Sequence, residues 1–203
     1  MSRPNIRIKS NWFKAGREHT PEELAGAVSF VAWRIADNAL KNTRRADFEI
    51  AIGPQYFAYL VEFLIFNIQV ADRIAYRRLS AEDRITFTGT LANRVADTLA
   101  ENESRLMGGA VSECKQRFIE RLNRQADGYA EFDYDEQGPS FNFMRYLGYC
   151  MEPVVDEKDR SWILDQTMSI EAPEAVEMLE KTLGNLLETE PRQARRRSGT
   201  SGD

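Results

Sequence analysis

The chain has 203 residues and a formal net charge of −5, with 42% hydrophobic and 29% charged residues. This length suits a single domain that buries a sizeable core without disulfides, and the composition excludes a wholly disordered chain. The charge is unevenly placed, because residues 191–203 hold four arginines and one aspartate, so the rest of the chain is strongly acidic. An acidic body argues against nucleic acids and anionic membranes as binding partners.

Three segments divide the chain. Residues 1–19 are a basic, irregular N-terminal extension, residues 20–190 a helical domain, and residues 191–203 a disordered Arg-rich tail. The start of the chain lacks the apolar core of a secretory signal, so we expect a reducing cytoplasm, with a Cys114–Cys150 disulfide as the lesser alternative. The most apolar run, residues 57–71, is too short and too polar in places to span a membrane.

The first strong helix signal is the segment Thr20-Pro21-Glu22-Glu23. Thr20 can accept a backbone hydrogen bond as N-cap, Pro21 suits the first helical position, and Glu23 can complete a capping box. These residues predict a helix over about 21–42.

Periodicity and turn residues predict the remaining elements. We expect a loop at 128–139 and only one weak strand candidate, at 48–52. Further helices are expected at about 54–78, from Ser80 to Gly108-Gly109, at about 110–126, 140–151 and 157–168, and from Pro173 to about 188. Helices joined by short loops predict an all-α fold, an antiparallel bundle of about six to seven helices.

The helix at 54–78 is almost entirely apolar, but it carries a polar stripe. At 100° per residue, one side collects Gln55, Tyr59, Glu62, Gln69, Arg73, Tyr76 and Arg77. This stripe is either a narrow solvated edge or the wall of a pocket or partner interface formed by Tyr59, Glu62 and Gln69. The second interpretation has a physical reason, since a carboxylate in so apolar a segment must find a partner or shift its pKa.

Three asparagines interrupt apolar helix faces. Asn67 lies opposite the polar stripe, among leucine and phenylalanine positions, and Asn38 and Asn42 continue the apolar face of the first helix. A buried amide has to be hydrogen-bonded. Asn67 is therefore either a helix–helix hydrogen bond that fixes register or a ligand contact in an internal cavity.

Two aspartates lie beside arginines on these same helices. Asp37 is close to Arg34, and Asp72 is next to Arg73. Buried Asp–Arg pairing between the two helices is the structural interpretation, and a functional site is the alternative.

Motifs for catalysis and for metal or cofactor binding are missing from the sequence. His19 is the only histidine, which leaves no Glu-x-x-His pair, zinc cluster or catalytic triad. The acidic segment from Asp133 resembles a calcium loop only at its start, because its twelfth position is Met144. We therefore predict no metal or cofactor and regard an enzyme as the least favoured function.

Two hypotheses about function remain. The first is an interaction or assembly protein that binds another protein or itself, suggested by the aromatic segment 128–151 and by a heptad-like stripe in the last helix. This stripe consists of Val176, Leu179, Leu183 and Leu186. The second is a bundle that binds a small apolar ligand in a pocket near Asn67.

Overall fold

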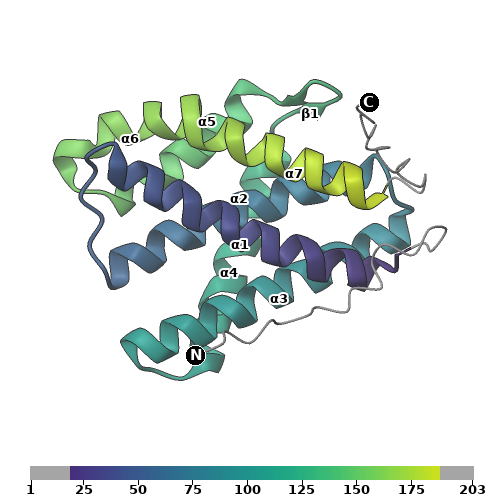
Figure 1. Ribbon diagram of the computed structural model, residues 1–203, viewed down its shortest axis with the longest axis horizontal. Helices are drawn as coiled ribbons and strands as arrows, with labels where there is room; N and C mark the ends of the chain where they lie inside the picture. Colours follow the sequence, from purple (N-terminus) through teal and green to yellow (C-terminus); the bar gives the residue numbers. More distant parts are fainter. Residues whose placement is uncertain (1–18, 188–203) are drawn as a thin grey trace, which may run out of the picture.

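The computed structural model describes residues 19–187. Within this range the chain folds as an all-α bundle, as predicted (Figure 1). The N-terminal extension and the Arg-rich tail expected from the sequence lie outside the described residues, apart from residue 19. None of the helices in the described part has the length and apolar content needed to cross a membrane.

Long helices make up most of the structure. They are α1 (Pro21–Arg45), α2 (Pro54–Tyr76), α3 (Ala81–Met107), α4 (Val111–Ala130), α5 (Phe141–Met151), α6 (Arg160–Gln166) and α7 (Ala172–Leu187). Two short strands, β1 (Tyr134–Asp135) and β2 (Gly138–Pro139), pair antiparallel between α4 and α5. Single 3₁₀ turns, Glu152–Val154 and Glu157–Asp159, lead into α6.

Side-chain caps begin three of these helices. Thr20 and Glu23 form the predicted capping box, with backbone and side-chain groups exchanging hydrogen bonds of 3.3 Å. Ser80 accepts the backbone N–H of Asp83 at 3.1 Å at the start of α3, and Ser140 caps α5 in the same way. Each cap satisfies a backbone donor that the first helical turn leaves unpaired.

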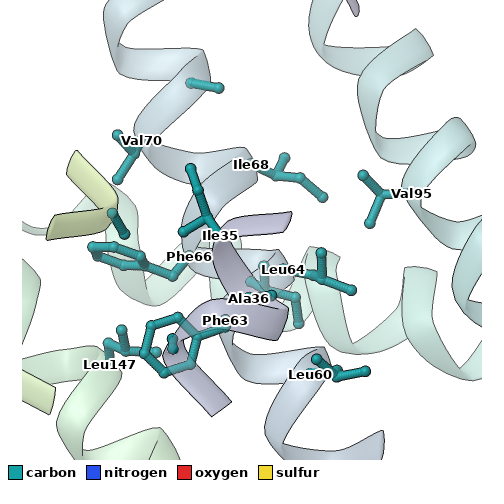
Figure 2. Close-up of a cluster of buried hydrophobic side chains, with 14 of the residues drawn as sticks. Ile35, Ala36, Leu60, Phe63, Leu64, Phe66, Ile68, Val70, Val95 and Leu147 are labelled. Atoms are coloured by element: carbon teal, nitrogen blue, oxygen red, sulfur yellow. The ribbon is translucent and has the colours of Figure 1, made fainter. Parts of the chain in front are cut away.

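The helix α2 is the centre of the bundle. α1, α2 and α3 run along the long axis in alternating directions, and α7 returns along the same axis beside α1 (Figure 1). Figure 2 shows apolar side chains of several helices meeting around α2, among them Ile35, Phe63, Phe66, Val95 and Leu147. Burial of these side chains is the main stabilising contribution to the fold.

The last helix begins differently from the expectation. Pro173 does not open a separate helix, because α6 continues into α7 through a π-helical turn, Thr167–Glu171. A proline inside an α-helix has no N–H to donate and its ring clashes with the carbonyl four residues earlier. The wider turn, in which the N–H of Ala172 donates to the carbonyl of Thr167, accommodates the proline without breaking the helix.

Other local expectations are corrected by the structure. Residues 48–52 form no strand; Arg44 instead donates two hydrogen bonds, of 3.1 and 2.7 Å, to the carbonyl of Ile50. The loop expected from residue 128 begins later, since α4 extends to Ala130. Cys114 and Cys150 are both free thiols, which removes the disulfide alternative.

Candidate functional site

Part of the polar stripe of α2 is buried rather than solvated. Tyr59 and Glu62 are almost completely inaccessible, whereas Tyr76 and Arg77, at the end of the helix, are exposed. Glu62 is covered because α4 and α5 pack against its side of α2, whereas Tyr59 points to another cluster, described below, and contacts Thr43 of α1. The interpretation as a solvated edge is therefore wrong for Tyr59 and Glu62.

Glu62 lies in a polar cluster where α2, α4 and α5 meet. One carboxylate oxygen is 2.5 Å from a guanidinium nitrogen of Arg121, and the other accepts a hydrogen bond of 2.6 Å from the amide of Gln125. The thiol of Cys150, on α5, lies close enough to the carboxylate to interact with it electrostatically. The side chain of Glu62 is only 1% exposed, whereas the side chain of Arg121 is 44% exposed. The ion pair therefore consists of a buried carboxylate and a cation that is partly accessible to solvent.

Burial dominates the electrostatics of this cluster. It raises the pKa of Glu62, although Arg121, Gln125 and Cys150 all lower it in part. Burial, and then the neighbouring Glu62, raise the pKa of the Cys150 thiol to about 12. Cys150 is therefore a neutral thiol at ordinary pH and is unsuited to act as a nucleophile.

Two polar atoms beside Glu62 have no hydrogen-bonding partner among the described residues. They are Oε1 of Gln125 and the hydroxyl of Tyr129. Both side chains belong to α4 and both are buried. Since buried polar groups are normally paired, these two atoms mark a place where a further hydrogen bond can form.

A groove leads from the surface to this cluster. It lies between the first half of α2, the end of α3 and α4, and it has a volume of about 440 Å³. Glu62 and Arg121 belong to its lining, and its floor is apolar, formed mainly by Phe57, Val61 and Phe118. In Figure 1 this is the end of the bundle where the turn between α3 and α4 lies close to the start of α2.

Exposed hydrophobic side chains occur in the lining of the groove and close to it in the sequence. Met107 lines the groove and is 46% exposed, and it lies against Gly53, at the start of α2. Ile52, Leu106 and Val111 are neighbours of these positions in the chain and are also exposed. We call these four side chains, Ile52, Leu106, Met107 and Val111, the apolar rim.

A second buried carboxylate, Glu171, lies on the π-helical turn. It accepts hydrogen bonds from Gln166, at 2.9 Å, and from Asn42, at 3.4 Å. Burial raises its pKa, and no lysine or arginine of the described chain forms an ion pair with it. Near it, the hydroxyls of Tyr59 and Thr43 are 2.7 Å apart. Tyr59 is thus part of this cluster and is separated from the groove.

The remaining predicted residues are dispersed. Asn67 donates to the carbonyl of Ala32 at 3.0 Å, a buried helix–helix hydrogen bond, and neither this groove nor the hollow described below includes it in its lining. Arg73 donates to the carbonyl of Tyr129 at 3.1 Å. Asn38 is exposed, so it does not extend the buried face of α1.

The expected pairing of aspartates and arginines between α1 and α2 does not form. Asp72 is instead paired with Arg84 of α3, and it also accepts a hydrogen bond of 2.7 Å from Thr88. Asp37 pairs with Lys41 within α1, at 2.5 Å. The short connection between α2 and α3 places Arg84 closer to Asp72 than any arginine of α1.

Another hollow, of about 500 Å³, lies at the far end of α1. It is lined by Phe48, Trp162 and Ile170, together with Asp47, Asp159 and Asp165. None of the residues that the sequence analysis singled out belongs to it.

The partners of Glu62 were missed by sequence reasoning. Gln125 continues the spacing of Cys114, Phe118 and Leu122 on α4, so it falls on the buried face. That signal was present in the sequence, because residue 125 lies within the helix predicted at about 110–126.

Comparison with known proteins finds no matching family model, no matching curated protein and no matching solved structure. Among residues 19–187, no group of three or more histidine, cysteine or acidic side chains is placed to hold a metal ion. The groove beside Glu62 unites an apolar floor, exposed cations and a buried carboxylate, which is a combination suited to binding.

Proposed function

We propose that this protein is an interaction protein, and that the groove between α2, α3 and α4 binds an acidic amphipathic segment of a partner protein. The observation that carries the proposal is that the groove has an apolar floor and that its lining includes Met107, an exposed member of the apolar rim. Exposed apolar side chains beside an apolar hollow are typical of sites where proteins bind one another. An amphipathic helix whose apolar face enters the groove would cover both.

The charges at the mouth of the groove favour an acidic segment. Arg117, Arg121 and Arg124 are exposed on successive turns of α4 and all line the groove. Of the acidic groups in the lining, Glu103 is paired with Arg117 and Glu62 is buried, and the exposed Glu120 accepts a hydrogen bond of 2.8 Å from Gln116. Because most of the body is acidic, this local row of arginines would attract a negatively charged partner to this particular face.

A separate partner is favoured over a second copy of the chain. The two features that suggested self-association contribute in large part to the intramolecular core, while Phe141 and Tyr149 of the aromatic segment are exposed. The heptad-like stripe of α7 is packed against the core through Val176, Leu179 and Leu183, and Tyr129 and Phe143 of the aromatic segment are also buried there. The free thiols are in keeping with a reducing, cytoplasmic setting for this interaction.

A small apolar ligand remains the second candidate. The volume of the groove, about 440 Å³, lies within the range of small-molecule pockets. We propose the groove beside Glu62 as the site of this ligand, because Asn67 belongs to the lining of neither hollow. A small ligand would leave the apolar rim uncovered, which is why we favour a protein segment.

The test is a selection from a random peptide display library on the immobilised protein. We expect enriched peptides with apolar residues at helical spacing, which bind the wild type and lose affinity for Ala58→Trp, a substitution that fills the groove. Ala81→Trp, at the exposed start of α3, is the matched control and should bind normally. Met107→Glu, at the rim, gives a second variant that does not disturb the core.

Peptides that bind Ala58→Trp and Met107→Glu as well as the wild type would overturn the proposal. So would the absence of any enriched peptide. Circular dichroism of each variant confirms that a loss of binding does not come from unfolding.

A further inference from the structure

We propose that the groove receives a carboxylate of its ligand at Arg121, and that Glu62, released from Arg121, takes up a proton from solvent as the ligand binds. This inference rests on the proposed function of the groove. No covalent bond changes: the guanidinium exchanges one carboxylate partner for another, and the displaced carboxylate becomes a carboxylic acid.

The asymmetric burial of the pair makes this exchange feasible. Arg121 is 44% exposed and faces the groove, while the Glu62 side chain is 1% exposed. An incoming acid therefore meets the cation at the surface and does not need to enter the core.

The surroundings of Glu62 disfavour its charge once Arg121 has turned away. The other groups that face it are Gln125 and Tyr129 from α4, and Cys150 and Tyr146 from α5. None of these is a cation. A buried carboxylate without a cation carries a large desolvation cost, and it avoids this cost by becoming protonated.

The cluster already contains an acceptor for the new proton. A protonated Glu62 needs a hydrogen-bond acceptor for its O–H group. Oε1 of Gln125 is buried and has no partner among the described residues, and it belongs to the amide that contacts Glu62. In the ionised state the N–H of this amide donates to the carboxylate of Glu62. When the amide rotates, its Oε1 can accept the O–H of the protonated acid, so a hydrogen bond is available in both charge states of Glu62.

The electrostatics agree with this geometry. Burial already raises the pKa of Glu62 with Arg121 in place. Loss of the cation raises it further, which opens a pH range in which the free protein holds Glu62 ionised and the complex holds it protonated.

The test is isothermal titration with decanoate, an apolar chain that ends in one carboxylate, kept below its micellar concentration. Decanol, with a chain of the same length and no charge, is the control ligand. Titrations in two buffers of different protonation enthalpy give the number of protons taken up. We expect decanoate to bind the wild type with net proton uptake and with an affinity that falls, by up to about tenfold per pH unit, as the pH rises through that range.

Glu62→Gln distinguishes this proposal from general anion binding. This variant keeps the shape of the side chain and leaves Arg121 in place, so it should bind decanoate without proton uptake and with a flat pH profile. Ala58→Trp should weaken both decanoate and decanol, which places the binding in the groove.

Decanoate binding to the wild type without proton uptake would overturn the inference, as would proton uptake that persists in Glu62→Gln. Failure of decanoate to bind more tightly than decanol would overturn it as well. If one of these results is obtained and peptides are still selected on the groove, the proposed function stands and only the proton-uptake inference fails. If the peptide selection fails, the proposed function is what is contradicted.

Discussion

Replacing Arg121 with methionine tests the pair at the centre of the candidate site. Methionine keeps most of the apolar stem but removes the cation 2.5 Å from Glu62. Breaking a fully buried ion pair costs about 3–5 kcal/mol, and the partial exposure of Arg121 reduces this because water can replace the guanidinium. We therefore expect Arg121→Met to lower the free energy of unfolding by about 2–3 kcal/mol at pH 8.

The loss should depend on pH in a definite direction. The pKa of Glu62 is raised in the folded protein, so between its unfolded and folded values the folded state holds more protons and loses stability as the pH rises. Removing Arg121 raises the pKa of Glu62 in the folded protein further, so the pH range in which stability falls extends upward. Within that range the free energy of unfolding changes by at most about 1.4 kcal/mol per pH unit. At pH 5, where Glu62 can remain protonated, the loss should be below about 1 kcal/mol.

Urea unfolding followed by circular dichroism at both pH values measures this difference. Arg124→Met, which removes an exposed arginine one turn further along α4, should cost less than about 0.5 kcal/mol at either pH. In the background of Glu62→Gln, the cost of Arg121→Met should no longer depend on pH. An equal loss at pH 5 and pH 8 in the wild-type background would refute the reasoning, because Arg121 would then act through its stem alone.

Three further predictions concern the rest of the bundle. Leu179→Ala should lower the free energy of unfolding by about 3 kcal/mol, because the side chain is buried in the core. The thermal midpoint of this variant should not depend on protein concentration; a dependence would indicate that α7 forms a dimer interface. Glu171→Gln removes a buried carboxylate whose pKa is raised, so its stability relative to the wild type, measured by urea unfolding, should improve from pH 5 to pH 8; a constant difference would contradict this. Gly148→Ala would bring a methyl group into Leu164 and should destabilise by about 1–3 kcal/mol in thermal unfolding, whereas Gly89→Ala, in open space on α3, should stabilise by up to about 1 kcal/mol; similar shifts for both would contradict it.

The sequence was informative where the physical cause is local. The capping residues Thr20 and Ser80 act within three positions, so the starts of α1 and α3 could be predicted from short segments. The partners of Glu62 could not, because Gln125 lies 63 positions along the chain and reaches it only through tertiary contacts of α4. A helical wheel gives the side on which a residue lies, and it does not say whether another helix covers that side.

The pairing of Asp72 also shows that the sequence does not indicate which residues meet in the tertiary structure. The sequence correctly indicated that this carboxylate needs a cation, and it offered the nearest arginines as candidates. The structure supplies Arg84 instead, because the turn between α2 and α3 brings it alongside. A partly buried carboxylate requires a cation whatever the fold, but the tertiary structure decides which cation lies beside it.

Glu62 and Glu171 together indicate why one carboxylate belongs to a site and the other to the scaffold. Both are buried and both have a raised pKa, and a hydrophobic side chain at either place would avoid the cost of desolvating a charge. Glu171 is held by amides inside the bundle, which suits a carboxyl group that fixes the π-helical turn. Glu62 is held by a cation that reaches solvent through a groove, and a ligand can remove that cation without unfolding anything. A buried carboxylate whose only cation is accessible from outside is a group whose charge can be changed by binding, and this is the property that the proposed interaction uses.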